Sequence, residues 1–157
     1  MTGFGQILED LNDAGVRYVL IGGIALIRHG VVRATRDVDA VFDPKQDNVE
    51  RIRMLIEQSG ATRPDGSAVP DDGISGDRTI HLATKHGDLD LLSEKSAGVS
   101  FADLRGRADT RRVDGVEALI CSLHDLVRLK RSAGRERDLV DLADLEVAHG
   151  ELPDTSA

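Results

Sequence analysis

The chain has 157 residues, of which 40% are hydrophobic and only 3% are aromatic, and it carries a net charge of −8 at pH 7. This length fits one domain with an aliphatic core. The negative charge argues against a general nucleic-acid coat protein, because nonspecific binding to duplexes depends mostly on neutralising phosphates. No apolar run approaches the roughly 18 residues of a membrane helix, and the N-terminus lacks the features of a secretion signal, so we expect a cytoplasmic protein without membrane association.

The first part of the chain, up to Gly60, is predicted to alternate helices and strands. Helical spacing of apolar residues, strand-like apolar runs and the positions of glycine and proline set the boundaries. A helix start is expected near Asp47 or Asn48, because both residue types favour the N-cap position. In order, the predicted elements are a helix ending near Gly15, a strand at 17–21, a short helix at 24–29 after Gly22-Gly23, a strand at 37–42 and a helix ending at Gly60.

The second part begins with an unpatterned segment and ends in two helices. Residues 61–76 are rich in Gly, Pro and Asp, and we interpret them as a mobile loop that could border an acceptor pocket. The later predicted elements are a hairpin of strands at 78–84 and 88–92, a short helix capped by Ser100, a hairpin of strands at 111–113 and 116–120, a helix between Ser122 and Gly134, and a last helix at about 137–148.

The last predicted helix is amphipathic, with an acidic face beside an apolar stripe. The stripe consists of Leu139, Leu142 and Leu145, and the acidic face of Asp138, Asp141 and Asp144. We expect a single domain over residues 1–149, followed by a flexible tail at 150–157.

A pair of aspartates on the second strand, Asp37 and Asp39, is the main candidate for chemistry. Side chains alternate across a strand, so both project from one face with Cα atoms roughly 7 Å apart. Two such carboxylates can share one divalent cation or hold two, and without a cation they repel each other. Asp90 on a later strand is a third candidate, since leucines flank it. Asp88 shares the face of Asp90 but stands beside a turn, where aspartate is common.

Glycine and basic residues lie close to this pair in the sequence. Gly22-Gly23 permits a tight turn before a short helix, which makes a candidate phosphate site. Arg33, Thr35 and Arg36 directly precede the carboxylates, and they could orient phosphates or form a solvated surface. The five histidines are too scattered to suggest a zinc site, and the single cysteine excludes an internal disulfide.

Basic residues are also concentrated between positions 105 and 137, where they form either a local basic surface or scattered solvated charges. They are Arg105, Arg107, Arg111, Arg112, Arg128, Lys130, Arg131, Arg135 and Arg137.

The order of a strand, Gly22-Gly23, Asp37-Val38-Asp39 and a later strand with Asp90 resembles the signature of the nucleotidyltransferase superfamily with the polymerase-beta-like fold. The stretches GGIALIRHGVVRATRDVD and LVRLKRSAGRERDLVDLADL also look like a small bacterial branch, the AbiEii-type (type IV toxin) nucleotidyltransferases. The resemblance implies a minimal α/β (α+β) fold with a mixed sheet flanked by helices and a C-terminal helix pair.

The resemblance also implies an activity: an NTP gives its NMP to an acceptor hydroxyl in the presence of Mg²⁺ or Mn²⁺. By position, Asp37, Asp39 and Asp90 would be the catalytic and metal-binding residues, with Asp90 also helping to deprotonate the acceptor. Many relatives carry serine in place of Gly23, so one phosphate contact is missing here. Together with Arg36, the predicted nucleotide-binding residues are Gly22, Gly23, Lys130 and Asp138.

The acceptor stays open at this point. RNA, as for a toxin-like enzyme with an antitoxin partner, fits the C-terminal motif and the basic stretch. An antibiotic hydroxyl, as for aminoglycoside or lincosamide nucleotidyltransferases, fits the first motif and the chain length. A non-catalytic antitoxin or dimerising module would keep the fold without turnover, and the three intact carboxylates argue against it.

Overall fold

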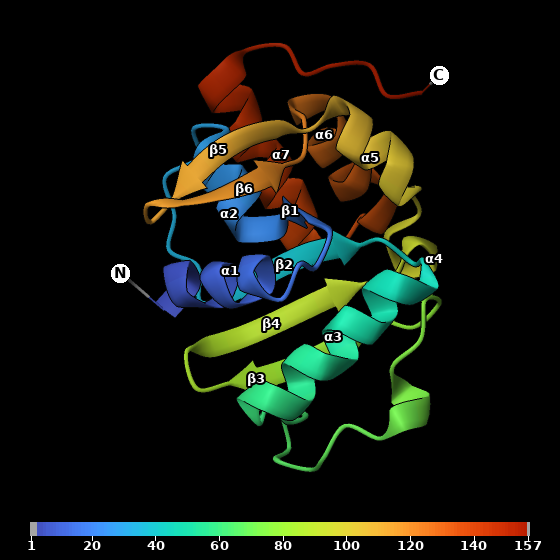
Figure 1. Cartoon of the computed structure of the whole chain (residues 1–157). Coiled ribbons are helices and arrows are strands. Elements are labelled where there is room, and N and C mark those ends of the chain that lie inside the picture. The colour runs from blue at the N-terminus through green and yellow to red at the C-terminus, as the bar shows by residue number, and fades with distance from the viewer. Residues whose placement is uncertain (1–2, 157) are drawn as a thin grey trace.

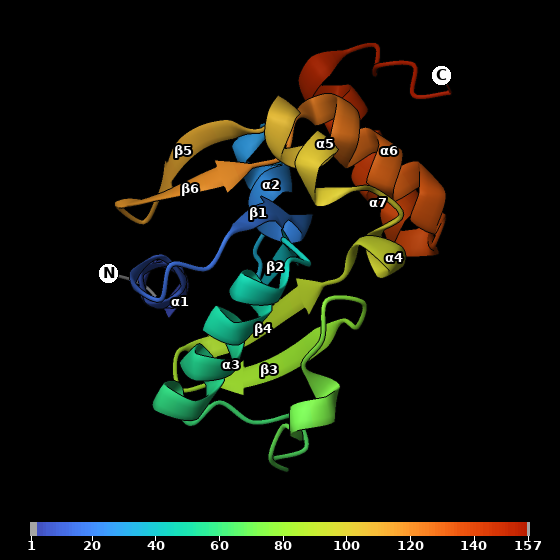
Figure 2. The ribbon, with the colours of Figure 1, turned by 45° about the vertical axis from the view of Figure 1, so that its right-hand side comes forward.

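A mixed β-sheet runs through the centre of the fold, with helices in front of it and behind it (Figures 1 and 2). The computed structural model describes residues 3–156, and within them the chain is an α/β protein with six strands and seven α-helices. None of these helices is long and apolar enough to cross a bilayer. In chain order the elements are α1 (Gly3–Asp13), β1 (Tyr18–Ile21), α2 (Gly22–Arg28), β2 (Asp37–Phe42), α3 (Gln46–Ser59), the 3₁₀ turn η1 (Asp71–Gly73), β3 (Ile80–Thr84), β4 (Gly87–Leu92), α4 (Glu94–Ala97), α5 (Phe101–Arg107), β5 (Asp109–Val113), β6 (Val116–Ile120), α6 (Leu123–Ala133) and α7 (Glu136–His149).

The sheet joins two hairpins to a central pair of strands. Its order is β3-β4-β2-β1-β6-β5, and β1 and β2 are antiparallel at its centre. β4 joins β2 and β6 joins β1 in parallel orientation, whereas β3–β4 and β5–β6 are antiparallel hairpins. The sequence resemblance implied this mixed sheet, and α6 and α7 pack together as the expected C-terminal helix pair.

Most predicted boundaries are confirmed, because they depend on local signals. Strand β2 begins and ends where the sequence predicts, and α3 ends at Gly60, whose φ of 70° is left-handed. Ser100 and Ser122 cap α5 and α6 by accepting hydrogen bonds from backbone N–H groups. Helix α2 begins at Gly22, two residues earlier than predicted, directly after β1.

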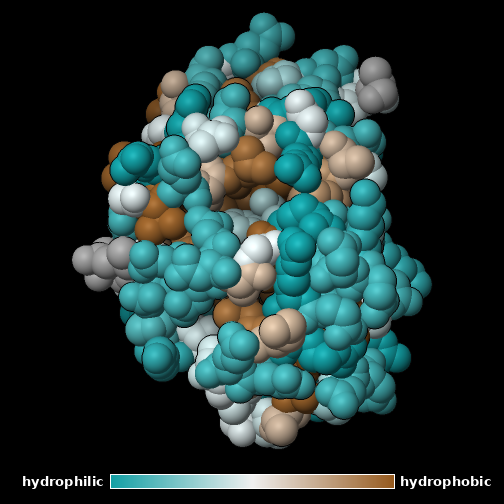
Figure 3. Space-filling model, viewed as in Figure 1, coloured by the Kyte–Doolittle hydropathy of each residue, from teal (hydrophilic) through white to brown (hydrophobic). Residues whose placement is uncertain are grey.

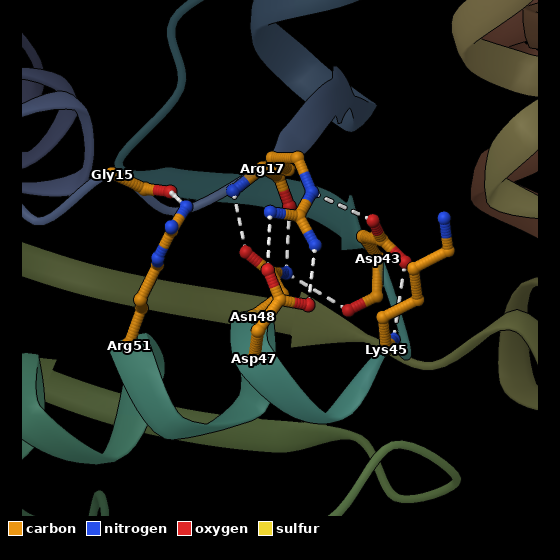
Figure 4. Close-up of polar contacts among 7 residues, drawn as sticks. All are labelled: Gly15, Arg17, Asp43, Lys45, Asp47, Asn48 and Arg51. Atoms are coloured by element: carbon orange, nitrogen blue, oxygen red, sulfur yellow. Dashed lines mark hydrogen bonds and ion pairs between the residues drawn. The ribbon is translucent and has the colours of Figure 1, made fainter.

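The start of α3 differs from the prediction. Its N-cap residue is Lys45, whereas Asp47 and Asn48 lie inside the first turn. Their side chains do not cap the helix because both bond to Arg17, just before β1 (Figure 4). The Arg17 guanidinium binds the carboxylates of Asp43 at 2.7 Å and Asp47 at 2.9 Å. These contacts hold α3 against the end of the central strand pair.

Asn48 is the buried centre of this network. Its Oδ1 accepts the N–H of Arg17 at 2.7 Å, and its Nδ2 donates to the carbonyls of Arg17 at 3.1 Å and Asp43 at 2.8 Å. A buried backbone group without a partner destabilises the fold. One side chain therefore binds three backbone groups just beyond the paired residues of β1 and β2, where the carbonyl of Arg17 also accepts the N–H of Asp43 at 3.2 Å.

Helix α7 turns two residues of the predicted acidic face inward and exposes one leucine of the predicted apolar stripe, which the periodicity of the sequence does not predict. Asp138 and Asp141 are 0% and 5% exposed, and Leu145 is buried beside them, whereas Leu139 is 58% exposed. Residues at i, i+3 and i+7 share one face of a helix, and here that face combines two aspartates with one leucine. Basic side chains from other elements make their burial tolerable, as described below.

The segment 61–76 contains no regular helix or strand, apart from the short 3₁₀ turn, as predicted for a loop. It is anchored, because Ile74 is buried and Arg53 of α3 donates to the carbonyls of Ile74 and of the 3₁₀ turn. Gly76 lies against Pro44, beyond the end of β2 that is remote from the predicted carboxylates. The final part of this loop therefore lies near that remote end of β2, and both the loop's mobility and its place beside an acceptor pocket stay predictions.

The last residues follow α7 without regular structure. Arg131 of α6 donates to the carbonyl of Pro153 at 2.7 Å and to the hydroxyl of Thr155 at 3.0 Å. A domain over 1–149 with a flexible tail at 150–157 remains a prediction, and residues 1, 2 and 157 lie outside the described part.

We predict that Asn48→Ala lowers the free energy of unfolding by about 3 kcal/mol, because the N–H of Arg17 and the carbonyl of Asp43 lose their Asn48 partner and the carbonyl of Arg17 loses one of its two donors. For a chain of this size the melting temperature should fall by roughly 6–12 °C, measured by circular dichroism. Asp47→Ala is the matched control, since it removes an exposed ion pair and should cost less than about 1 kcal/mol. Equal effects of the two variants would contradict the role given to Asn48.

Candidate active site

The parallel pairing of β2 with β4 brings four aspartates together. Asp39 lies opposite Asp90, and Asp37 lies opposite Asp88. Paired residues on adjacent strands project to the same face, so the four form two neighbouring pairs there. Asp37 and Asp88 are exposed, whereas Asp39 and Asp90 are half-buried. The structure thus brings the three predicted carboxylates together and adds Asp88. The pairing of Asp88 with Asp37 could be predicted only from the register between two strands that are distant in sequence.

The pair Asp39–Asp90 carries the strongest electrostatic cost. Burial is the largest cause that raises the pKa of the Asp39 carboxyl, and with charge repulsion and a shared hydrogen bond from the neighbouring Asp90 it brings that pKa to about 6. Asp37 adds to this effect, and the Lys130 ammonium opposes it. Within residues 3–156, no three acidic, histidine or cysteine side chains already surround one point as a metal cluster. Two crowded oxygen ligands whose repulsion a cation would relieve do fit a hard divalent ion such as Mg²⁺.

His81 is a further member of this site. Its Nδ1 lies 2.7 Å from Oδ1 of Asp90, and the two residues are cross-strand partners in the β3–β4 hairpin. The scattered positions of the histidines in the sequence do not indicate a site. The predicted β3–β4 hairpin, however, could have placed His81 beside Asp90. Because the connecting turn has two residues, Lys85 and His86, the register is fixed and places position 81 opposite position 90.

Gly22 lies directly against the carboxylate pair. Ile21, the last residue of β1, is paired with Asp39, and Gly22 follows with a left-handed φ of 68°. A Cβ at position 22 would collide with the Asp39 carboxylate, so only glycine fits. The predicted Gly22-Gly23 turn therefore borders the predicted carboxylates, and the α2 backbone starts there.

Lys130 lies at the edge of the site and is already paired. Its ammonium is 2.9 Å from Asp141 and 3.3 Å from Asp138, yet it is close enough to Asp39 to lower the pKa of that carboxyl. Arg33, from the linker before β2, binds the other oxygen of Asp141 at 2.5 Å. The sequence predicts Lys130 and Asp138 as nucleotide contacts, but it does not predict this network.

Asp138 itself has no exposed surface, so its influence on a nucleotide would act through its partners. Burial alone would raise the pKa of Asp138, but hydrogen bonds from Arg135 and Lys130 outweigh burial and lower it. Arg36, also predicted to contact the nucleotide, is exposed and forms no ion pair with residues 3–156.

A separate groove of about 240 Å³ lies between α1, β1, α5 and β6, lined by residues such as Val16, Phe101 and Leu119. It corresponds to the hydrophobic hollow in the upper half of Figure 3. None of the aspartates lines it. Its size alone does not make it the functional site, because the groups capable of chemistry lie elsewhere.

The family model described as "Nucleotidyltransferase of unknown function (DUF6036)" matches residues 4–150. The chain belongs to this nucleotidyltransferase family. No curated protein sequence matches the chain. The superfamily expected from the first motif is thereby confirmed, whereas the resemblance to the AbiEii-type branch remains a prediction.

Solved structures of low sequence identity share the fold. The lincosamide antibiotic adenylyltransferase LnuA, with lincomycin bound, matches with a TM-score of 0.64 and 16% identity, over 93% of this chain and 96% of that one. An antigenic nucleotidyltransferase-like protein from Paracoccidioides brasiliensis matches at 0.61 and 16%, over 92% and 72%. The antibiotic-resistance factor ANT(2'')-Ia matches at 0.61 and 12%, over 94% and 83%.

We predict that Asp39→Asn stabilises the metal-free protein above pH 6. A folded-state pKa raised from 3.8 to about 6 means that Asp39 favours folding most when protonated, and this contribution is lost as pH rises through that window. In EDTA, the variant should exceed wild type by up to about 3 kcal/mol at pH 7.5, with the difference vanishing near pH 4.

Urea unfolding at several pH values would measure this difference. The matched control is Asp37→Asn on the same strand, where the carboxylate is exposed and the gain should be much smaller. A pH-independent difference for Asp39→Asn would contradict the assigned cause.

Proposed function

We propose that the protein is an enzyme that transfers an NMP from an NTP to an acceptor hydroxyl. The single observation that carries this proposal is the Asp39–Asp90 pair, held together on adjacent strands despite its repulsion. Carboxylates arranged in this way serve cation-assisted phosphoryl chemistry, which depends mainly on positioning and charge neutralisation. Family membership agrees with the proposal.

Asp37, Asp39 and Asp90 would hold Mg²⁺ or Mn²⁺, which when bound would neutralise phosphate oxygens. The backbone at Gly22-Gly23 would lie along the triphosphate. The Asp90 carboxylate would accept the proton of the acceptor hydroxyl, and the hydrogen bond from His81 would fix its orientation.

Lys130 would provide positive charge next to the phosphates. It is also part of the fold, because Lys130→Ala would leave Asp138 and Asp141 buried with one cationic partner fewer. Nucleotide affinities of that variant therefore require a parallel measurement of its stability.

RNA is the first acceptor we propose. Four basic residues of the stretch 105–137 are ion-paired internally, namely Arg107, Arg111, Lys130 and Arg135. The other five form no ion pair within residues 3–156 and could contact a phosphate backbone; they are Arg105, Arg112, Arg128, Arg131 and Arg137. An antitoxin-like protein partner would accompany this toxin-like activity.

An antibiotic hydroxyl is the second candidate. The match to the lincosamide adenylyltransferase spans 93% of this chain and 96% of that one, so the part of that enzyme seen in its structure corresponds almost entirely to the fold described above. Incubation with each labelled NTP and magnesium, together with total RNA or a panel of aminoglycosides and lincosamides, distinguishes the two. Label on RNA alone or on one small molecule alone assigns the acceptor, whereas no transfer to any substrate with any NTP counts against the proposed enzyme.

The metal requirement gives a second test of the proposed function. Magnesium with a non-hydrolysable NTP analogue should raise the melting temperature of wild type, because ligands that bind only the folded state stabilise it. Asp39→Asn should abolish this shift, since it removes a ligand from the crowded pair. An unchanged wild-type melting temperature at millimolar ligand would oppose a metal-dependent nucleotide site.

A third test of the proposed function concerns the general base. Asp90→Asn should reduce single-turnover transfer by at least about a hundredfold, because help from a general base is typically worth that much or more. Asp88→Asn is the matched control: the residue lies two positions away on the same strand face but is exposed. Similar losses in both variants would show that total charge, and not the position of Asp90, governs the rate.

A further inference from the structure

The side chain of Thr35 occupies the space beside Gly23. A Cβ placed on Gly23 would lie 2.5 Å from Oγ1 of Thr35 and 2.8 Å from its Cβ. Such distances are too short for any side chain, so the threonine and a residue larger than glycine at position 23 exclude each other. The place that a short side chain at position 23 would take is thus filled by the Thr35 hydroxyl.

This hydroxyl lies where two parts of the candidate site meet. Thr35 is half-buried in the linker between α2 and β2, and its Oγ1 is 3.4 Å from the carbonyl of Asp37. On its other side lies the turn at Gly22-Gly23, and Gly22 is in contact with Asp39. Threonine is stiff at χ1, so its hydroxyl has few alternative positions.

The Thr35 hydroxyl is also able to donate a hydrogen bond to a ligand. A distance of 3.4 Å is well beyond the usual 2.7–2.8 Å of an O–H···O hydrogen bond, so the bond to Asp37 is weak and a better acceptor would replace it. The neighbouring cations are less available, because Lys130 and Arg33 bind the buried Asp141. A neutral donor beside the glycine turn that adjoins Asp39 is suited to an anionic ligand that must approach the carboxylates.

We propose that Thr35 is a nucleotide-binding residue whose hydroxyl donates a hydrogen bond to a phosphate oxygen of the NTP at the Gly22-Gly23 turn. The inference rests on the proposed nucleotidyl transfer. In this arrangement Gly23 leaves the space and Thr35 supplies the polar group, so the two positions form one functional unit.

The first test removes the hydroxyl and keeps the shape. Thr35→Val is nearly isosteric, and Thr35→Ser keeps the hydroxyl but loses the methyl group. Affinity for each of the four NTPs with magnesium is measured by calorimetry, and melting temperatures check that the variants fold. We expect Thr35→Val to bind about 10- to 100-fold more weakly, the usual effect of losing a hydrogen bond to a charged group, and Thr35→Ser to stay within a few-fold of wild type.

The second test moves the hydroxyl across the contact. Gly23→Ser alone should impair binding because it collides with Thr35, and Thr35→Gly alone should impair it because the donor is lost. The double variant Gly23→Ser/Thr35→Gly has room for the serine and returns a hydroxyl to the same place. We expect it to bind the NTP at least about tenfold more tightly than either single variant, a coupling that additive structural damage does not produce.

The outcomes separate this inference from the proposed function. If wild type binds an NTP and Thr35→Val binds it equally well, the role of Thr35 is overturned and nucleotidyl transfer stands. The role is also overturned if the double variant is no better than the weaker single variant. If wild type binds none of the four NTPs with magnesium, both proposals fall.

Discussion

The close approach of Asp39 and Asp90 is the constraint on which the candidate site depends. Two half-buried carboxylates on neighbouring strands repel each other, and burial together with this repulsion raises the pKa of Asp39. A fold keeps such an arrangement only when the surrounding structure over-determines it. Here the ladder between β2 and β4 fixes both backbones, so the side chains cannot move far apart.

A polar network holds the central strands at their other end, remote from the carboxylate pair. Arg17 and Asn48 tie the start of β1, the end of β2 and the first turn of α3 through hydrogen bonds that are buried or partly buried (Figure 4). These contacts are favourable and complete, in contrast to the carboxylate pair. The molecule thus separates a stabilising polar network at one end of β2 from an unfavourable charge cluster at the other.

Positive charge reaches the cluster indirectly. Lys130 stands between Asp39 and the buried carboxylates of α7, and Arg33 and Arg135 complete the pairing of those carboxylates. Lys130 therefore offsets part of the charge repulsion at Asp39, although its ammonium is paired with Asp138 and Asp141. The same fold occurs in a lincosamide antibiotic adenylyltransferase and in an antigenic nucleotidyltransferase-like protein, so the fold by itself does not name an acceptor.

The sequence by itself determined the local features: most helix and strand ranges, the strand bearing Asp37 and Asp39, and the glycine turn before it. These depend on periodicity and turn residues, whose physical effect extends over a few positions. The hairpin register that sets His81 against Asp90 was also encoded locally, in a two-residue turn. Even so, its functional meaning depends on where β4 joins the sheet.

Only the tertiary structure decided which charges meet. The parallel pairing that adds Asp88 to the cluster joins strands with no tight turn between them, so its register follows from packing and not from local sequence. Helical periodicity placed Asp138 on an acidic face beside the apolar stripe, and it did not predict the burial of this residue because it counts polarity alone. A buried charge becomes tolerable only through partners such as Lys130 and Arg135, and their arrival beside α7 is a property of the whole fold.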